Sequence, residues 1–480
     1  MILGGGSAGI VAGNVAGAVG ARVALVEKSR IGGECLWTGC VPSKALLHAS
    51  DMAQMIREAK NIGFKNLRSL RREDCSAAWD YVRQKIEETR VNDASEQMLK
   101  DSGVELFFGG GEFLGPHLVR SPEGDLQGAS FLIATGSSPR VPSIPGLEDA
   151  GYLTNVSLFD LTETPESVVI LGGGPIACEM GQALSRLGAE VTLLQRDERL
   201  LSKDDPENVA ILTECLRAEG LEIVLGAEVI SAARRDEQKT VTARLSDGTE
   251  KTFAAAEILV ATGRVPNSGH LGLDRVGVAR DKRGYIQTEP NGRTSVPHIW
   301  ACGDVIGEAQ FSHMAEHEAK KVVRNILLPG SEEIPLNLVP WTTFTDPEVA
   351  RVGLTEDEAR KKHGDETIRI LKHSFKQDDR AIVDNKTAGQ VKLIVHKVTG
   401  EVYGAHIVGP RAGELIQEWI IAIQQRLPVR VLADMIHVYP ALTVTNQRAA
   451  QKWYVGITEQ PLVKGALNLL GYSPHEPEIS

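Results

Sequence analysis

The sequence predicts an α/β protein with two Rossmann-like nucleotide-binding units. Glycine-rich fingerprints at Gly4 and Gly172 each stand between a short apolar strand and a helix of small residues. After the first fingerprint, residues 32–47 hold Cys35 and Cys40, which are separated by only four residues. Two cysteines this close, beside a nucleotide fingerprint, indicate a redox-active disulfide coupled to a bound flavin.

The bulk composition limits the classes of protein that remain. A chain of 480 residues, 42% hydrophobic and 24% charged, is typical of a globular protein of roughly three domains. Its net charge of −11 does not favour nucleic-acid binding, and no apolar run approaches the roughly 20 residues of a membrane helix. Apart from Cys35 and Cys40 the cysteines are scattered, which favours a cytoplasmic location over a secreted disulfide framework.

The first fingerprint is Gly4-Gly5-Gly6-Ser7-Ala8-Gly9. Gly4, Gly6 and Gly9 allow a tight turn and bring the backbone close to a pyrophosphate at the helix N-terminus. Glu27 ends the second predicted strand, 18 residues after Gly9, where a carboxylate accepts hydrogen bonds from ribose hydroxyls. This unit is therefore predicted to bind a dinucleotide.

The second unit repeats this pattern with one difference. Gly172, Gly174 and Ala177 occupy the fingerprint positions, but the position 18 residues after Ala177 is Gln195. Without the carboxylate, a 2′-phosphate is not repelled, and Arg196 and Arg199 supply positive charge for it. The second site is predicted to prefer NADPH, with NADH possible. The alternative is that both arginines simply face solvent.

Two similar stretches mark the boundaries between the units. FLIATGSSPR, residues 131–140, and ILVATGRVPN, residues 258–267, are apolar strands that end in small-residue turns. Proline-rich residues 139–145 are expected to form a linker. Farther along, Asp304 follows a short apolar strand, where it is expected either to bind a flavin ribityl hydroxyl or to cap a helix.

The cysteine segment also contains a helix start. Pro42 suits the first turn of a helix, so Cys40 is expected at the helix N-terminus, where the helix dipole lowers the pKa of its thiol. Lys44 lies one turn later, and Glu179 is its expected counter-ion, although both also fit as solvent-exposed helix charges. A zinc site is not expected, because no second cysteine pair completes four ligands.

The pattern GG-x-C-x4-C-x-PSK resembles that of the flavoprotein disulfide reductases, which include dihydrolipoamide dehydrogenases, glutathione reductases and mercuric reductases. The resemblance runs from Gly4 to about Gln451. It implies FAD at the first fingerprint and NAD(P)H at the second. The residues expected to hold the two cofactors are Gly4, Gly6, Gly9, Glu27, Gly33, Thr135, Gly136, Gly172, Gly174, Arg196, Arg199, Gly263 and Asp304.

The resemblance also assigns roles and domains. It implies that Cys35 attacks the substrate, that Cys40 faces the flavin, and that Lys44 and Glu179 pair beside flavin N5. It further implies three-layer ββα nucleotide-binding domains, a C-terminal α+β dimerisation domain, and a homodimer whose active site is shared across the interface. The expected bounds are 1–145 for the first part of the FAD-binding domain, 146–266 for the NAD(P)-binding domain, 267–336 for the central domain that completes the FAD site, and 337–480 for the interface domain.

The C-terminal region departs from the family pattern. Enzymes of the family that reduce disulfide substrates carry a His-Pro pair with a Glu five residues after the His, whereas this chain has Tyr439 before Pro440, and Val444. His437 is expected to point to the same side as Tyr439 and is a candidate substitute for the missing His, or else a packing residue. No cysteine follows Cys302, so the C-terminal cysteine pair that delivers mercury is also absent.

These departures leave the electron acceptor open. The sequence favours a mercuric-reductase-like enzyme whose small-molecule acceptor is a reactive disulfide or a thiophilic metal ion. The alternatives are dihydrolipoamide dehydrogenase activity, direct reduction of quinones by the flavin, and an FAD-binding subunit without redox activity. Residues 452–480 extend beyond the resemblance, with some helical apolar spacing and no assigned role.

Overall fold

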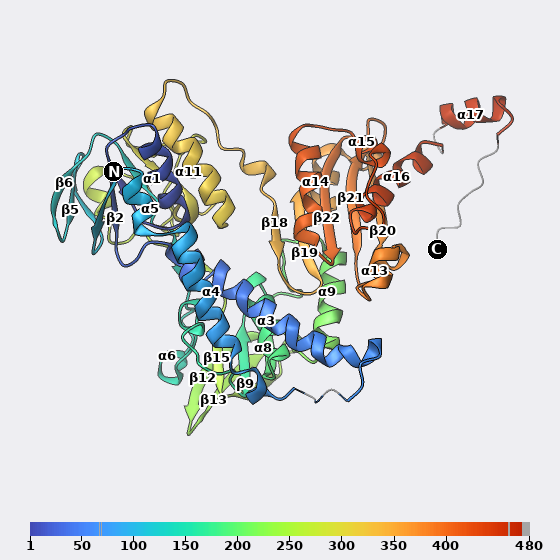
Figure 1. The fold of residues 1–480 in the computed structure, drawn as a ribbon, viewed down its shortest axis with the longest axis horizontal. Helices are drawn as coiled ribbons and strands as arrows, with labels where there is room; N and C mark the ends of the chain where they lie inside the picture. The colour runs from blue at the N-terminus through green and yellow to red at the C-terminus, as the bar shows by residue number, and fades with distance from the viewer. Residues whose placement is uncertain (67, 69, 459–460, 473–480) are drawn as a thin grey trace. The chain divides into compact units, whose positions relative to one another are not determined.

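The computed structural model describes residues 1–66, 68, 70–458 and 461–472. The chain folds into two compact units (Figure 1). The nucleotide unit comprises residues 1–198 and 219–336, and the C-terminal unit comprises residues 199–218 and 337–480. No helix in the described part of the chain is long and apolar enough to cross a membrane.

A five-stranded parallel sheet forms the first half of the nucleotide unit. Its strands are short, apolar and buried, as expected for a parallel sheet covered on both faces. The strand that comes latest in the chain, β17, is formed by residues beyond 267. A segment distant in the sequence therefore completes the sheet. In spatial order the strands are β17 (Ile299–Ala301), β7 (Phe131–Ile133), β1 (Ile2–Leu3), β2 (Val23–Glu27) and β3 (Val104–Phe108).

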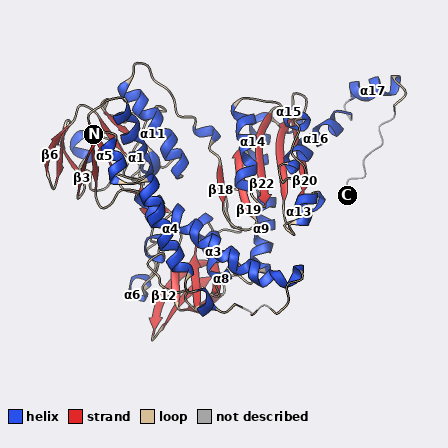
Figure 2. Cartoon of the chain, viewed as in Figure 1, coloured by secondary structure: helices blue, strands red, loops and turns tan. Residues whose placement is uncertain are grey.

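Different elements cover the two faces of this sheet. Helices α1 (Ser7–Ala18) and α11 (Ser312–Leu327) lie side by side (Figure 2), and α1 packs on β1, β2 and β3. On the other face, Phe113 and Val119 share a core with Leu3. They belong to an antiparallel meander of β4 (Glu112–Gly115), β5 (Leu118–Ser121) and β6 (Gly124–Gln127). These layers are the ββα arrangement that the sequence predicts.

A second sheet repeats the plan. The parallel strands, in spatial order, are β11 (Glu222–Leu225), β10 (Glu190–Gln195), β9 (Ser167–Leu171) and β15 (Glu257–Val260). Helix α8 (Pro175–Arg186) packs on β9 and β10. The meander that shares their core is β12 (Glu228–Arg235), β13 (Gln238–Arg244) and β14 (Glu250–Ala255).

Two antiparallel linker strands connect the sheets. β8 (Ser137–Pro139) leads from the first sheet to the second, and β16 (Arg264–Pro266) leads back. Helix α2 (Gly33–Trp37) precedes α3 (Cys40–Glu58), which packs against α8 and α4 (Ala78–Asp93). The remaining helices of this unit are α5 (Glu96–Asp101), α6 (Leu147–Ala150), α7 (Asn155–Leu158) and α10 (Leu273–Val276).

The C-terminal unit contains an antiparallel sheet with helices on both faces. In spatial order its strands are β18 (Trp341–Thr343), β19 (Glu348–Gly353), β22 (Val402–Gly409), β21 (Gln390–His396) and β20 (Ile368–Ser374). One face shares a core with α14 (Ala412–Gln424), α15 (Arg430–Asp434) and α16 (Val444–Thr458). Helices α9 (Pro206–Ala218) and α12 (Glu356–His363) also contact the sheet.

The position of α9 differs from the expected domain bounds, because residues 199–218 belong to the C-terminal unit. The physical reason is Lys392 on β21, whose side chain is 2% exposed and lies 2.9 Å from carboxylate oxygens of Asp205, Glu207 and Glu356. This ion cluster holds α9 and α12 to the sheet. The other expected bounds stay predictions.

The structure also contains short 3₁₀ helices and, in the C-terminal unit, further α-helices. The 3₁₀ helices are η1 (Ala59–Ile62), η2 (Arg72–Cys75), η3 (Gly303–Ile306), η4 (Leu336–Leu338), η5 (Asp365–Thr367) and η6 (Phe375–Gln377). Helices α13 (Asp379–Val383) and α17 (Pro461–Leu469) belong to the C-terminal unit. The tail beyond Lys452 is thus helical in part, while its residues 459–460 and 473–480 lie outside the described chain.

Candidate active site

The two fingerprints have the same backbone geometry. Gly4 and Gly172 have φ values of +108° and +118°, and a Cβ atom at either would lie 2.4 Å from a carbonyl oxygen, of Ala134 and Ala261 respectively. Any other residue is strained in this conformation and collides with the neighbouring strand. The chain therefore turns sharply from each strand into a helix, which aims the helix N-terminus at the turn.

These helix N-termini fit the phosphates of dinucleotides. The N-cap residues are Gly6 for α1 and Gly174 for α8, and no described side chain caps either helix. The first backbone amides of a helix lack intrahelical acceptors and carry the positive end of the dipole, so they favour an anion. Gly33 approaches Gly6 so closely that a Cβ on Gly33 would lie 2.6 Å from the Gly6 Cα atom. Only glycine allows the two backbone segments to come this close. The backbone beside the first fingerprint therefore carries no side chain that would block a dinucleotide.

Glu27 lies where the ribose of the first dinucleotide is expected. Its carboxylate is buried at the end of β2 and accepts hydrogen bonds from the Gly5 N–H at 2.7 Å and the Ser29 N–H at 2.9 Å. These bonds fix the carboxylate and leave oxygen lone pairs for sugar hydroxyls. The acceptor oxygens of this carboxylate therefore fit the ribose hydroxyls in the adenosine half of FAD.

Asp304 lies three residues after β17, at the same carboxyl edge of the parallel sheet as Glu27. Its Oδ2 atom accepts a hydrogen bond from the Ser137 hydroxyl at 2.6 Å. Asp304 is the second residue of η3, so the alternative role as a helix N-cap does not hold. Burial raises the pKa of its carboxyl. Thr135 donates its hydroxyl hydrogen to the Asn267 carbonyl oxygen at 2.7 Å, which joins the two linkers.

The second nucleotide site has an additional carboxylate, Asp197, beside its candidate arginine. Gln195 ends β10 and donates to Asp197 Oδ2 at 3.1 Å. Arg196 is 80% exposed, and its Nε atom lies 3.6 Å from Asp197 Oδ1. Arg199 belongs to the C-terminal unit, where it donates to the Ser202 carbonyl oxygen at 2.6 Å. Arg196 is therefore the accessible arginine, partly neutralised by Asp197.

The two cysteines lie in a short helical turn and at the start of a long helix. Cys35 is in α2, and Cys40 is the first residue of α3, as the sequence predicts. Both are free thiols in this structure. The Cys40 sulfur lies 3.3 Å from the Ser312 hydroxyl at the start of α11. Ser312 was not singled out from the sequence, because nothing local marks a serine 272 residues away as a neighbour.

Contact between the two thiols opposes the lowering of the Cys40 pKa that is expected from the helix dipole. The hydrogen bond with the Cys40 thiol lowers the pKa of Cys35 to about 6. The same hydrogen bond raises the pKa of Cys40, because its proton is held against the Cys35 thiolate.

Lys44 and Glu179 meet as the sequence analysis expected. Lys44 Nζ lies 2.8 Å from Glu179 Oε2, and the Glu179 side chain is only 6% exposed. The lysine comes from α3 and the glutamate from α8, so the ion pair joins the helix that follows the cysteines to the second nucleotide-binding helix. Their role beside a flavin stays a prediction.

His437 and Tyr439 differ sharply in exposure. Tyr439 is 66% exposed and donates its hydroxyl hydrogen to Asp379 Oδ2 at 2.9 Å. The His437 side chain is 2% exposed, with Nε2 3.5 Å from Glu418 Oε1 and Nδ1 3.1 Å from the Met435 carbonyl oxygen. The expectation that His437 points to the same side as Tyr439 is not met, because its ring packs inward against α14.

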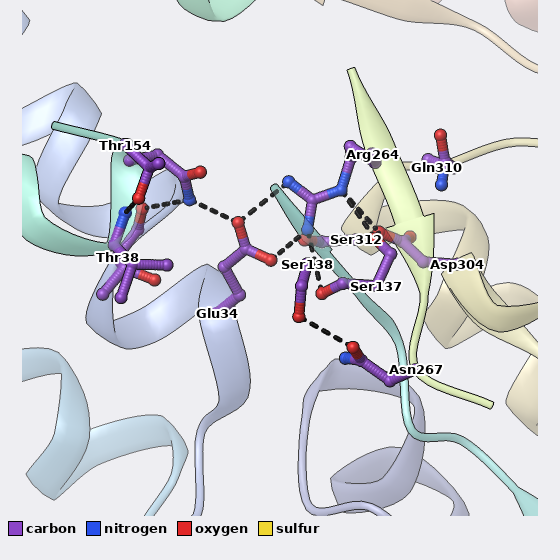
Figure 3. A network of polar contacts seen from close by, with 12 residues as sticks. Glu34, Thr38, Ser137, Ser138, Thr154, Arg264, Asn267, Asp304, Gln310 and Ser312 are labelled. Carbon is purple, nitrogen blue, oxygen red and sulfur yellow. Dashed lines mark hydrogen bonds and ion pairs between the residues drawn. The ribbon is translucent and has the colours of Figure 1, made fainter. Parts of the chain in front are cut away.

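A polar network that no motif in the sequence predicts lies beside the cysteines. Glu34, Arg264 and Ser137 connect the α2 segment to Asp304 (Figure 3). Arg264 lies in the ATGR stretch and Glu34 lies in the cysteine motif, so both residues belong to segments that the sequence marks as functional. Their pairing spans 230 residues, which no local pattern reveals.

Comparison with known proteins agrees with this geometry. The profile of the pyridine nucleotide-disulphide oxidoreductase family matches residues 1–319, and that of the family's dimerisation domain matches residues 339–450. The chain is 35% identical to a mercuric reductase of Staphylococcus aureus over 439 residues, covering 92% of this chain and 79% of the relative. It is 33% identical to a dihydrolipoyl dehydrogenase of Geobacillus stearothermophilus over 464 residues, covering 94% and 95% of the two chains.

Solved structures resemble the chain over nearly its full length. The HOCl-induced flavoprotein disulfide reductase RclA from Escherichia coli superimposes with a TM-score of 0.84 at 27% identity, covering 94% of this chain and 98% of that one. Its Cu(II) complex gives a TM-score of 0.83 at the same identity, with 93% and 98% coverage.

The fold and site define an oxidoreductase with two dinucleotide sites and a thiol pair between them. More narrowly, the chain belongs to the pyridine nucleotide-disulphide oxidoreductase family. It is an FAD-dependent enzyme that uses NAD(P)H, and it carries the family's dimerisation domain.

Proposed function

We propose that the reduced Cys35–Cys40 pair delivers electrons to a thiophilic metal ion or a small reactive disulfide, as in a mercuric-reductase-like enzyme. The observation that carries this proposal is the C-terminal segment around Tyr439. Its exposed side chain is a phenol bonded to Asp379, whereas the imidazole of His437 is buried. The position five residues beyond Tyr439 is Val444, which has no proton to exchange.

The proton balance favours the metal ion over the disulfide. Oxidation of two thiols to the Cys35–Cys40 disulfide releases two electrons and two protons. A divalent metal ion reduced to the metal accepts the electrons alone, whereas a disulfide substrate needs both protons to leave as two thiols. General acid–base help is typically worth about 10²–10⁴-fold in rate. A C-terminal segment without an exposed imidazole therefore handicaps the disulfide more than the metal ion.

The residues of the nucleotide unit support the first half of the reaction. FAD supplies the two-electron chemistry that links NAD(P)H to the thiols. Glu27 and the α1 N-terminus would hold its adenosine and phosphates, while Asp304 would offer a carboxylate to the ribityl chain. Cys35 binds the acceptor as a thiolate, since its pKa is lowered to about 6. The Cu(II) complex of the Escherichia coli relative is consistent with a metal ion as acceptor.

The assembly is the second part of the proposal. We expect a homodimer in which the Tyr439 segment of one subunit completes the thiol site of the other. The dimerisation-domain match over residues 339–450 supports the dimer, and the exposed side chains of Ile436, Val438 and Tyr439 suit a buried contact. A cytoplasmic location is expected from the scattered cysteines.

An anaerobic acceptor screen tests the proposal. The NADPH-reduced holoenzyme is mixed separately with Hg(II), Cu(II), lipoamide, glutathione disulfide and a quinone, and reoxidation is followed by absorbance. We expect fast, Cys35-dependent turnover with Hg(II), Cu(II) or glutathione disulfide, abolished by Cys35→Ser. Efficient turnover of lipoamide would establish the dihydrolipoamide dehydrogenase alternative. Quinone turnover that survives Cys35→Ser would instead show electrons leaving the flavin directly.

A further inference from the structure

Glu34, the residue before Cys35, is the centre of a polar network (Figure 3). Its Oε1 atom accepts a hydrogen bond from Arg264 Nη1 at 2.9 Å, and its Oε2 atom accepts from Arg264 Nη2. Oε1 also accepts from the side-chain amide of Asn155. Such a bidentate arginine–carboxylate pair fixes orientation as well as distance.

The partners of Glu34 come from separate segments of the nucleotide unit. Arg264 begins the linker strand β16, and Asn155 begins helix α7. Asn155 also donates to the Thr38 carbonyl oxygen at 3.0 Å, so it contacts the cysteine segment twice. One carboxylate thus ties the segment that carries Cys35 to both a linker strand and a helix of the second nucleotide half.

Arg264 is itself held firmly. Its Nε atom donates to the Ser137 hydroxyl at 2.6 Å, and Nη2 donates to the Ser137 carbonyl oxygen at 3.2 Å. Nε also lies 3.4 Å from Asp304 Oδ2. The guanidinium is mostly buried, with 16% of the side chain exposed. It therefore gives Glu34 a fixed anchor instead of a mobile surface partner.

The backbone around Cys35 supplies little rigidity of its own. Gly32 and Gly33 have positive φ values, of +113° and +58°, and α2 has only five residues before Gly39. Glycines on both sides leave such a segment conformationally free. Yet the neighbouring Cys40 sulfur lies 3.3 Å from the Ser312 hydroxyl, and Cys40, Ser312 and Ser7 all lower the pKa of the Cys35 thiol. The buried Leu36 and the Trp37 indole, which donates to the Ile31 carbonyl oxygen at 2.8 Å, hold one side of α2, and Glu34 holds the other.

We propose that Glu34 is a positioning residue for Cys35. Its carboxylate, clamped by Arg264 and Asn155, holds α2 so that the Cys35 sulfur stays among Cys40, Ser312 and Ser7. The inference rests on the proposed function in taking Cys35 as the thiol that meets the acceptor. Glu34 itself does not react.

The test compares Glu34→Ala and Glu34→Gln in the FAD-loaded, NADPH-reduced enzyme. The primary measurement is the rate of Cys35 alkylation by iodoacetamide across pH, with the modified residue identified by peptide mass. In Glu34→Ala we expect the half-maximal pH to rise by about one unit, which slows alkylation about threefold at pH 6.5. Glu34→Gln keeps one acceptor oxygen for Arg264 and should restore part of the rate.

Two controls separate positioning from general damage. Glu112→Gln removes another glutamate–arginine pair of the same unit, with Arg275 at 2.8 Å, and should leave the alkylation profile unchanged. Ferricyanide reduction, which draws electrons from the flavin without the thiols, should stay within about twofold of the parent enzyme. An unchanged profile in Glu34→Ala, or an equal loss of FAD content and ferricyanide reduction, overturns the proposal. Failure of every acceptor in the screen would overturn the proposed function but leave the shifted alkylation profile standing.

Discussion

Lys44 Nζ lies 2.8 Å from Glu179 Oε2, so one ion pair joins the helix that begins at Cys40 to the helix of the second fingerprint. The carboxylate is nearly buried, while the lysine remains partly exposed. A cation fixed in this way can stabilise negative charge nearby without reorganising. The pair is therefore suited to support a reduced flavin.

Removal of the cation tests this role. In Lys44→Met we expect anaerobic reduction of the flavin by NADPH to slow by about tenfold or more, since about 1.4 kcal/mol of stabilisation corresponds to tenfold. Stopped-flow absorbance gives the rate. Lys100→Met, which removes an exposed lysine paired with Glu96, is the matched control and should match the parent. Equal rates in the parent and Lys44→Met would exclude the role.

The lowered pKa of Cys35 predicts the pH dependence of its reactivity. Because the folded pKa lies near 6, the thiolate is populated above pH 6 and lost as the pH falls through that value. Alkylation of the reduced enzyme should be half-maximal near pH 6. Cys40→Ala removes the hydrogen bond and should raise this midpoint toward the ordinary thiol value near 8.5. A midpoint that stays near 6 in Cys40→Ala would contradict the assigned cause.

Nucleotide preference tests the role of Arg196. We expect a higher kcat/KM for NADPH than for NADH, and Arg196→Ala should reduce that ratio by about tenfold because a charge-assisted bond to the 2′-phosphate is lost. Asp197→Asn should increase the ratio, since Asp197 partly neutralises Arg196. Steady-state kinetics with both nucleotides measures the effect. A clear preference of the parent enzyme for NADH would rule out this interpretation.

The buried Lys392 predicts a large effect on stability. Lys392→Met leaves Asp205, Glu207 and Glu356 facing one another, and we expect about 3 kcal/mol lower unfolding free energy by urea denaturation. Lys372→Met removes an exposed lysine that also pairs with Glu207, and should cost about 1 kcal/mol or less. Similar losses in the two variants would contradict the difference in burial.

The same cluster predicts an acid-dependent loss of stability. Burial alone raises the pKa of Glu207, but the bonds from Lys372 and Lys392 outweigh it and lower the pKa to about 2. A depressed folded pKa contributes stability above the unfolded value near 4.3, and this is lost as the pH falls toward 2. Glu207→Gln should flatten the pH dependence of the unfolding free energy in that window.

Features that depend on neighbours in the sequence were predictable. The glycine turns at Gly4 and Gly172, the helix start at Cys40 and the carboxylate of Glu27 are each defined within some 30 residues of chain. Lys44 and Glu179 were also anticipated, because the family resemblance placed both beside one cofactor. The orientation of His437 was not, because alternation along an extended segment does not describe a ring that packs against Glu418.

By itself the sequence determined the class of chemistry, since the fingerprints and the Cys35–Cys40 spacing are local patterns whose residue types dictate what they bind. The tertiary structure decided which group lies beside the Cys40 sulfur and what holds the segment that carries Cys35. Both depend on groups distant in the chain, with Ser312 reaching Cys40 and Arg264 reaching Glu34. Hydrogen bonds act over about 3 Å in space, whereas a sequence records only distance along the chain.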